Sequence, residues 1–229
     1  MKLCKVTGNQ LKIIALVAMT CDHVGKILLP QVAILQILGR LAFPIFAYMI
    51  AEGCNYTKSK KKYLLSMAGL AVICQIAFWV AIGSVYQCVP VTFTLSIGLI
   101  YLLQWAEKEK KLWCYVTCAF GFLTVAFVCV VLPWMIPNTD FAIDYGILGV
   151  LLPVSVYLAK SKTVKLISMS AILVGLCVWM GELQWYSLLV PVLMFFYSGK
   201  RGVMKLKHLF YIYYPLHLAG IYLIGLVVF

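Results

Sequence analysis

The stretch LVAMTCDHVGKILL, residues 16–29, decides the fold of this chain and raises the question of its function. Its apolar residues suit the interior of a lipid bilayer, yet its centre holds Asp22, His23 and Lys26. A charged side chain at the middle of a membrane costs at least about 2.5–3.5 kcal/mol. Ionisable residues at this depth are therefore candidates for a functional site.

The whole chain has the composition of an integral membrane protein. Of its 229 residues, 64% are hydrophobic and 11% are charged, and the mean hydropathy is +1.01. Soluble domains average about 45–50% apolar and about 25% charged residues. No polar stretch is long enough to form a separate soluble domain, so we predict a single integral membrane domain over residues 1–229.

Apolar segments of the length that crosses a bilayer recur along the whole sequence. A transmembrane helix needs about 20 mostly apolar residues. The candidate spans are 11–29, 32–51, 63–83, 90–106, 112–133, 144–159, 164–181, 183–198 and 206–228. We therefore predict an all-α, polytopic bundle of about nine transmembrane helices.

The net charge of +12 is distributed as the positive-inside rule requires. Lysine-rich runs occupy 58–62, 107–111, 160–165 and 200–207. With a cytoplasmic N-terminus all four fall on the cytoplasmic side, and the opposite loops contain no Lys or Arg. The charge thus indicates a multi-pass protein among membrane lipids and not a nucleic-acid-binding protein. Some of these lysines could instead meet anionic headgroups or a phosphorylated cofactor.

The nine cysteines do not indicate a metal site or a disulfide framework. They lie mostly in apolar segments and form no C-x-x-C pair. Buried free cysteines behave as small hydrophobic residues. We expect no bound metal and no tightly bound cofactor.

Two opposite charges are predicted to meet across the first hairpin. If the chain turns at Pro30-Gln31, Asp22 and Arg40 each lie about nine residues from the turn, roughly 13 Å deep at about 1.5 Å per residue. An ion pair between them would compensate two otherwise costly charges. Lys26 lies one turn nearer the outer face, where it can either extend toward solvent or pair with Asp22.

The two histidines that lie well inside the apolar segments are expected at the same depth. His217 lies ten residues after Lys207 and His23 eleven after Lys12, each roughly 15–16 Å above the cytoplasmic edge. Asp22, His23, Arg40 and His217 can therefore form one polar layer, in which a histidine could act as a general base. The alternative is that these residues are structural pairs that lock the hairpin.

A second polar layer is predicted at the cytoplasmic edge. Glu52 lies level with Lys12, and the two could form a simple salt bridge or contact a ligand. The neighbouring residues would suit a phosphate-bearing cofactor that enters from the cytoplasm: Tyr56, Thr57, Lys60, Lys61 and Lys62.

Residues near the outer face and in the last span are weaker candidates. Asp144 begins the predicted span 144–159 and is expected to cap that helix, with substrate contact as the alternative. Pro215 should kink the last span beside Tyr214 and free backbone carbonyls. We count Lys26, Asp144, Tyr145 and Tyr214 as candidate substrate contacts.

Several of these motifs together resemble the TraX family. The motifs are LKIIALVAMTCDHVG (11–25), GRLAFPIFAYMIAEGCNYTKS (39–59), TFTLSIGL (92–99), DYGILGVLL (144–152) and FYIYYPLH (210–217). TraX proteins are polytopic membrane proteins named for the conjugal-transfer protein that acetylates the N-terminus of F-type pilin. The resemblance extends over nearly the whole chain and implies a bacterial cytoplasmic (inner) membrane.

The resemblance implies an acyltransferase that uses acetyl-CoA, or another acyl-CoA, as co-substrate. His23 would take the proton from an amine or hydroxyl acceptor, and Asp22 would orient the imidazole. Arg40 would steady Asp22 or stabilise the oxyanion, and His217 would be a second acid/base or an oxyanion donor. The acceptor stays open among a pilin-like peptide, a glycan and a lipid.

Two other functions fit the same residues. A proton-coupled transporter could relay protons through the Asp22, His23 and Arg40 layer. Discontinuous half-helices or internal symmetry would favour that alternative, and the sequence shows neither. A non-catalytic assembly factor for an envelope complex would keep its activity without His23.

Overall fold

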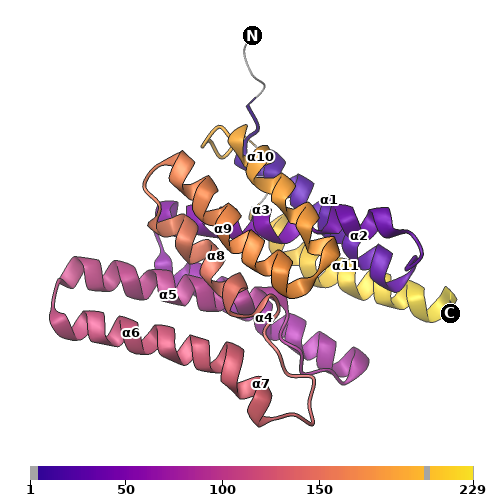
Figure 1. Ribbon diagram of the computed structural model, residues 1–229. Helices are drawn as coiled ribbons and strands as arrows, with labels where there is room; N and C mark the ends of the chain where they lie inside the picture. Colours follow the sequence, from indigo (N-terminus) through magenta and orange to yellow (C-terminus); the bar gives the residue numbers. More distant parts are fainter. Residues whose placement is uncertain (1–4, 204–206, 229) are drawn as a thin grey trace. The chain divides into compact units, whose positions relative to one another are not determined.

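The computed structural model describes residues 5–203 and 207–228, and helices dominate it (Figure 1). Among these residues two isolated β-bridges occur but no sheet. The prediction of an all-α protein is confirmed. Residues 204–206, part of the fourth lysine-rich run and the start of the ninth predicted span, lie outside the described residues.

The chain forms two compact units. The first comprises the residues up to Met49 together with those from Lys162 onward, and the second comprises Ile50–Ser161. The boundary at 49–50 falls inside one helix, α3 (Ala42–Tyr56). The prediction of one domain over the whole chain stays a prediction.

The first unit contains both histidines of the predicted polar layer. Its helices are α1 (Gly8–Ile27), α2 (Ala33–Gly39), the start of α3, α9 (Lys162–Met180), the 3₁₀ helix η2 (Glu182–Leu188), α10 (Leu189–Phe195) and α11 (Lys207–Val228). Its core includes the buried cluster Leu16, Ala18, Met19 and Ala42, against which Leu41, Phe46, Tyr213 and Tyr214 pack.

The second unit carries the lysine-rich runs at 58–62 and 107–111. Its helices are the end of α3, α4 (Lys60–Ile82), α5 (Val89–Glu109), α6 (Leu112–Ala126), the π-helix η1 (Phe127–Val131), α7 (Leu132–Met135) and α8 (Gly146–Leu158). Gly83 caps the end of α4, and its φ of 65° is the left-handed conformation that glycine adopts without steric cost.

The residues at the start of α1 fix where this helix begins. Thr7 is the N-cap, and the side chains of Thr7 and Gln10 satisfy each other's backbone N–H groups in a capping box. The N–H groups of Gly8 and Asn9 donate to the carbonyls of Lys200 and Arg201 at 2.8 and 2.9 Å. The first helix is therefore anchored at its predicted cytoplasmic end by the loop before α11.

A helix break lies beside Arg40. Residues 33–56 form one apolar stretch, but the backbone separates α2 from α3 at Arg40 and Leu41. Pro44 explains the break, because its ring clashes with the carbonyl four residues earlier, that of Arg40, and it has no N–H to donate. The N–H of Leu41 instead donates to the carbonyl of Leu38 at 3.2 Å, a tighter turn than an α-helix makes.

Six helical segments among the described residues are long and apolar enough to cross a membrane. They are Ala33–Tyr56, Lys60–Ile82, Val89–Glu109, Leu112–Met135, Lys162–Met180 and Tyr211–Val228. The other three predicted spans differ from these: α8 has 13 residues, the 183–198 region splits into η2 and α10, and α1 carries three charged residues. A multi-pass membrane protein is confirmed, whereas nine spans and a cytoplasmic N-terminus stay predictions.

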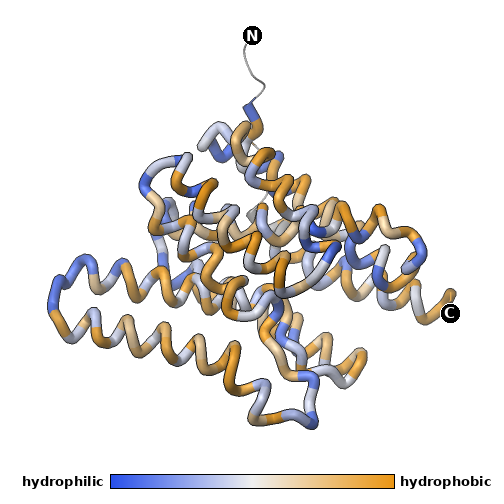
Figure 2. The backbone as a smooth tube through the Cα atoms, in the orientation of Figure 1, coloured by the Kyte–Doolittle hydropathy of each residue, from blue (hydrophilic) through white to orange (hydrophobic). Residues whose placement is uncertain are grey.

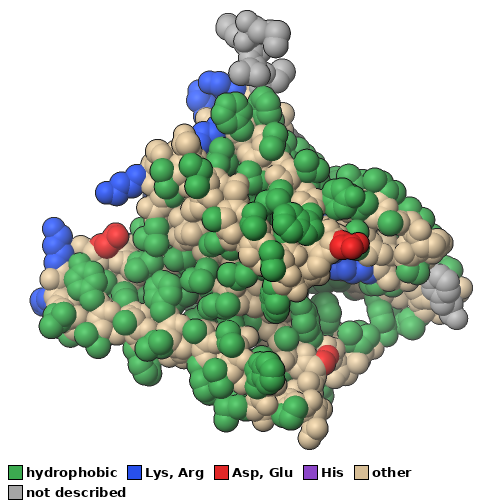
Figure 3. Space-filling model, in the orientation of Figure 1, with side chains coloured by type: hydrophobic (Ala, Val, Ile, Leu, Met, Phe, Trp, Pro, Cys, Tyr) green, Lys and Arg blue, Asp and Glu red, His purple; other side chains and the backbone are tan. Residues whose placement is uncertain are grey.

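Apolar side chains cover the outside of these helices, as lipid contact requires. Figure 2 shows hydrophobic residues along every long helix with polar residues gathered at the connections, and Figure 3 shows apolar side chains over much of the visible face. On α6, for example, Leu112, Phe120 and Leu123 are 80%, 70% and 68% exposed. In water such exposure would be a costly apolar surface.

Candidate functional site

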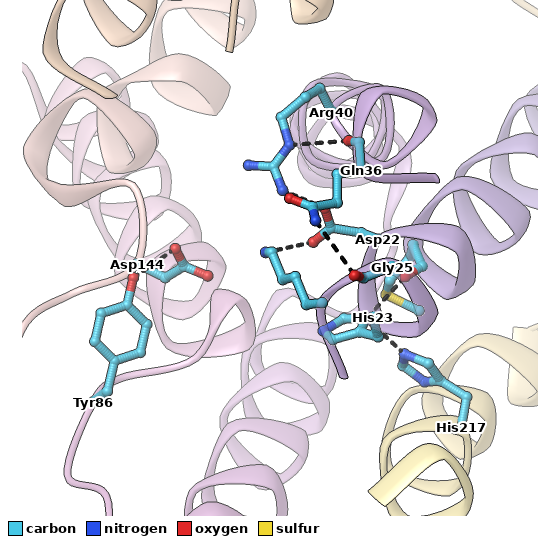
Figure 4. A network of polar contacts seen from close by, with 10 residues as sticks. Asp22, His23, Gly25, Gln36, Arg40, Tyr86, Asp144 and His217 are labelled. Carbon is cyan, nitrogen blue, oxygen red and sulfur yellow. Dashed lines mark hydrogen bonds and ion pairs between the residues drawn. The ribbon is translucent and has the colours of Figure 1, made fainter. Parts of the chain in front are cut away.

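Asp22 forms the centre of an ion-pair cluster between α1 and α2 (Figure 4). Its Oδ1 pairs with Nη2 of Arg40, and its Oδ2 accepts a hydrogen bond from Nζ of Lys26 at 2.6 Å. Asp22 and Arg40 are only 8% and 9% exposed. The predicted Asp22–Arg40 pair is confirmed, and of the two alternatives for Lys26 the structure shows the pairing with Asp22.

Two glycines allow α1 and α2 to approach closely enough for this cluster. A Cβ at Gly39 would overlap the Cβ and carboxylate of Asp22, and a Cβ at Gly25 would lie 2.9 Å from the Cβ of Leu35. The side-chain amide of Gln36 also donates to the carbonyl of Gly25 at 3.3 Å. Glycine is therefore required at both positions, which explains why these two residues accompany Asp22 and Arg40 in the sequence motifs.

His23 faces His217 of α11 (Figure 4). Nε2 of His217 lies 3.2 Å from Nδ1 of His23, and the ring centroids are 5.0 Å apart at an interplanar angle of 68°. His217 is 9% exposed and His23 is partly buried. The two side chains predicted to share one depth are thus in direct contact, 194 residues apart in the sequence.

The imidazole of His23 is held by groups other than Asp22. Its Nδ1 lies 2.8 Å from the carbonyl oxygen of Met19, in addition to its contact with His217. Within the described part of the chain, Asp22 makes no hydrogen bond to His23, and its two carboxylate oxygens pair with Arg40 and Lys26. Nor does Nε2 of His23 have a hydrogen-bond partner there, which leaves this nitrogen available for a reacting group.

Two residues that sequence reasoning did not single out support this contact. The hydroxyl of Thr20 donates to the carbonyl of Leu16 at 2.9 Å, so the Tyr213 hydroxyl donates to Thr20 Oγ1 at 2.7 Å. The ring of Tyr213 stacks on His217, with centroids 5.2 Å apart and planes 5° apart. The signal in the sequence was the four-residue spacing of Tyr213 and His217, which places both on one face of a helix.

The predicted cofactor residues divide between the two units. Lys12 belongs to α1 in the first unit, whereas Glu52, Tyr56 and Lys60–Lys62 belong to the second. Glu52 is buried at 6% exposure, and Tyr56 is 74% exposed at the end of α3. The predicted pairing of Glu52 with Lys12 stays a prediction.

The lysines at the start of α4 adjoin an open hollow on the protein surface. It has a volume of about 380 Å³ and is lined by Ser59, Lys61, Lys62, Leu65 and Ser66. Nζ of Lys60 lies 5.8 Å from the ring centroid of Tyr101. An exposed helix start with several lysines is suited to bind anions, because its first backbone N–H groups have no partner within the helix.

The prediction that Asp144 caps α8 is wrong. Tyr145 occupies the N-cap position in a left-handed conformation, with φ of 59°, and its side chain makes no capping hydrogen bond. Asp144 instead accepts a hydrogen bond from the Tyr86 hydroxyl at 2.8 Å (Figure 4). Its backbone carbonyl accepts one from the Thr92 hydroxyl at 2.8 Å. Burial and the nearby Asp144 carboxylate raise the pKa of Tyr86. These contacts connect loops and helices of the second unit.

Pro215 lies inside α11, which continues through it from Lys207 to Val228. Tyr214, one residue earlier, packs edge-on against His217 with ring centroids 5.6 Å apart. No group of three or more His, Cys, Asp and Glu side chains that could hold a metal ion occurs within the described ranges.

Comparison with known proteins agrees with the motifs. The family described as TraX protein matches residues 7–225 of the chain. An uncharacterized protein of Rickettsia prowazekii, RP591, is 26% identical over 204 residues, which cover 87% of this chain and 73% of that protein. A probable fimbrial assembly protein of Dichelobacter nodosus, FimC of serogroup H1, is 25% identical over 241 residues, which cover 92% of each. No solved structure matches.

Proposed function

This chain belongs to the TraX family, and from that premise we propose that it is a membrane-embedded acyltransferase. It would move an acetyl or other short acyl group from acyl-CoA to an amine or hydroxyl acceptor. The observation that carries the proposal is the contact between His23 and His217 at 3.2 Å, beside a buried ion-pair cluster. Ionisable residues inside a membrane are energetically costly, so two histidines in contact within an apolar helix bundle are candidates for a functional site.

His23 is the proposed general base. Its Nε2, which has no hydrogen-bond partner among the described residues, would remove the proton from the acceptor as the acceptor attacks the thioester carbonyl. A general base typically contributes about 10²–10⁴-fold to the rate. The neighbouring Arg40 and Lys26 supply positive charge that Asp22 holds in place, and fixed charge of this kind stabilises an oxyanion best where water is excluded.

The proposed donor site is the cytoplasmic hollow at the start of α4. Lys61 and Lys62 line it, and the first backbone N–H groups of α4, which a helix leaves without partners of its own, could bind the phosphates of CoA. Lys12, Glu52 and Tyr56 are further candidates for the same cofactor. This assignment places the N-terminus in the cytoplasm and the chain in a bacterial inner membrane, with the lysine-rich loops on the cytoplasmic side.

The first acceptor to test is a pilus or fimbrial subunit. The name of the Dichelobacter nodosus relative refers to fimbrial assembly, and the family is named for a protein that acts on pilin. Glycan and lipid hydroxyls are the other acceptors. Asp144, Tyr145 and Tyr214 stay candidate substrate contacts.

The decisive experiment is an acyl-transfer assay with the purified full-length protein. The protein in detergent or nanodiscs is incubated with acetyl-CoA labelled in the acetyl group, with and without a pilin-like peptide, and labelled product and free CoA are counted. We expect slow CoA release without acceptor and faster release with it, both abolished in His23→Ala. Absence of release and of bound acyl-CoA in a folded protein would reject the proposal.

Proton-coupled transport is the second candidate, and the helix break beside Arg40 favours it. Transporters often bind ions and substrates where a membrane helix is interrupted. A transporter reconstituted into liposomes would move protons or solute without acyl-CoA, and His23→Ala would abolish that flux. Flux without acyl transfer would favour this candidate over the acyltransferase.

A further inference from the structure

Two backbone carbonyls determine where the histidine pair carries its protons. Nδ1 of His23 lies 2.8 Å from the carbonyl oxygen of Met19, and Nδ1 of His217 lies 2.9 Å from that of Tyr213. A carbonyl oxygen accepts hydrogen bonds but cannot donate them. Each imidazole must therefore carry a proton on Nδ1, directed at the carbonyl four residues earlier in its own helix.

The hydrogen bond between the two rings can then run in only one direction, from His23 to His217. Nε2 of His217 lies 3.2 Å from Nδ1 of His23, which already carries a proton. A second proton on Nε2 of His217 would make two N–H groups face each other. This nitrogen must therefore be a lone-pair acceptor, so that His217 is neutral and accepts a share of the Nδ1–H of His23.

The surroundings hold His217 in this role. Tyr213 stacks on one face of its ring, and Tyr214 packs edge-on at 5.6 Å. The Tyr213 hydroxyl is fixed in turn to Thr20 of α1 at 2.7 Å, one turn before His23. Rotation of the His217 ring would break its bond to Tyr213 and its contact with His23 together.

We propose that His217 is a positioning residue and that Nε2 of His23 is the only nitrogen of the pair that exchanges a proton during the reaction. This inference rests on the proposed acyl transfer. It replaces the expectation that His217 is a second acid/base or an oxyanion donor. His217 and the carbonyl of Met19 perform the orienting task that the resemblance suggested for Asp22.

The proposed step transfers one acyl group to the acceptor and one proton, through His23, to CoA. The acceptor nitrogen or oxygen forms a bond to the thioester carbonyl carbon, and its proton passes to Nε2 of His23. The resulting imidazolium directs its Nδ1–H at two acceptors, the Met19 carbonyl and Nε2 of His217, which stabilise the charge. The C–S bond then breaks, and His23 returns the proton to the leaving thiolate of CoA. His217 keeps its proton on Nδ1 throughout.

The first test reads the protons directly. Protein labelled with ¹⁵N-histidine is studied by NMR in nanodiscs, and the signals are assigned with His23→Gln, His217→Gln and His208→Gln variants. We expect protonated Nδ1 and unprotonated Nε2 on both His23 and His217 at neutral pH. A proton on Nε2 of His217 in the folded wild type would overturn the proposal.

The second test uses replacements of His217 that differ in hydrogen bonding. The side-chain oxygen of Gln can accept the Nδ1–H of His23, so His217→Gln should retain turnover within about tenfold of wild type. His217→Ala and His217→Lys offer no acceptor. In metal sites, loss of the group that orients a histidine typically costs about 10–100-fold, and we expect a loss of this size here. If His217→Gln is as inactive as His217→Ala, His217 exchanges protons itself and the proposal is wrong.

The two tests separate this inference from the function on which it rests. His208→Gln is the control for removal of a histidine. A wild-type protein that transfers no acyl group rejects the acyltransferase, while the NMR test still decides the proton placement. Active protein whose His217 carries a proton on Nε2 rejects the positioning role alone.

Discussion

Asp22 and His23 are neighbours in the sequence, but the structure gives them opposite kinds of surroundings. Both oxygens of Asp22 are paired, one with Arg40 and one with Lys26. His23 is held through Nδ1 alone, and its Nε2 has no partner within the described ranges. A carboxylate whose two oxygens are both ion-paired stabilises its surroundings, whereas a positioned nitrogen with an available lone pair can react. This difference supports the proposal that Asp22 stabilises the hairpin and that His23 performs the chemistry.

The largest expected effect is that of His23→Ala on turnover. Because the His23 side chain bonds to one carbonyl and one histidine and is only partly buried, its removal should leave the fold and the affinity for acyl-CoA intact. Loss of a general base should lower the rate by about 10²–10⁴-fold. CoA affinity and turnover are measured separately. A variant that keeps more than about a tenth of wild-type turnover would end the catalytic assignment, given the usual contribution of a base.

Asp22→Asn tests the other side of the comparison. It leaves the buried Arg40 without its charge partner, and breaking a buried ion pair typically costs about 3–5 kcal/mol. Folding yield and thermal stability should therefore fall. The double variant Asp22→Asn/Arg40→Gln removes both charges and should recover much of the loss, though not the activity. A double variant no more stable than Asp22→Asn would show that the pair is not what stabilises the hairpin.

The sequence predicted this region well because helix geometry converts residue number into depth. Counting from the turn at Pro30-Gln31 placed Asp22 opposite Arg40, and counting from the lysine-rich edges placed His23 level with His217. Counting cannot give rotation about the helix axis. For this reason the sequence suggested Asp22 as the residue that orients His23, and only the structure points to His217 and the carbonyl of Met19 instead.

Other features failed in prediction for different physical reasons. The cap expected at Asp144 was wrong because Tyr86 and Thr92, more than fifty residues earlier, bind it, and local propensity does not contain such contacts. Pro44, four residues later, could have predicted the helix break at Arg40. The uniformly apolar composition of this segment instead led to the prediction of one continuous span. The span predicted at 183–198 is apolar enough, yet its backbone forms η2 and a short α10.

A smaller effect is expected where the two helices of the hairpin approach. Gly39→Ala would insert a Cβ into Asp22, and overpacking of this kind typically costs about 1–3 kcal/mol. The control is Gly220→Ala in α11, where a Cβ meets nothing within 4 Å and should be neutral or stabilising by about 0.5–1 kcal/mol. Thermal unfolding in detergent compares the two. Equal stability of both variants would contradict the close packing at Asp22.

The smallest expected effect concerns binding rather than chemistry. Replacing Lys60, Lys61 and Lys62 together by Gln should weaken acyl-CoA binding without changing the turnover of bound substrate. These side chains are exposed, and exposed charge pairs contribute about 0.2–1 kcal/mol each, so we expect roughly a tenfold loss of affinity. The loss should shrink at high salt, because at about 1 M ionic strength charges are screened within about 3 Å. Binding is measured by titration at two salt concentrations.

The matched control removes the same number of positive charges from another lysine-rich loop. Lys108, Lys110 and Lys111 lie where α5 ends and α6 begins, in the same unit as α4. Replacing these three by Gln removes equal charge but leaves the hollow beside Lys61 and Lys62 unchanged. If both triple variants lose affinity equally, the lysines act through overall charge and the hollow is not the donor site. A loss confined to the first variant, with turnover preserved, would separate binding at α4 from the proton transfer assigned to His23.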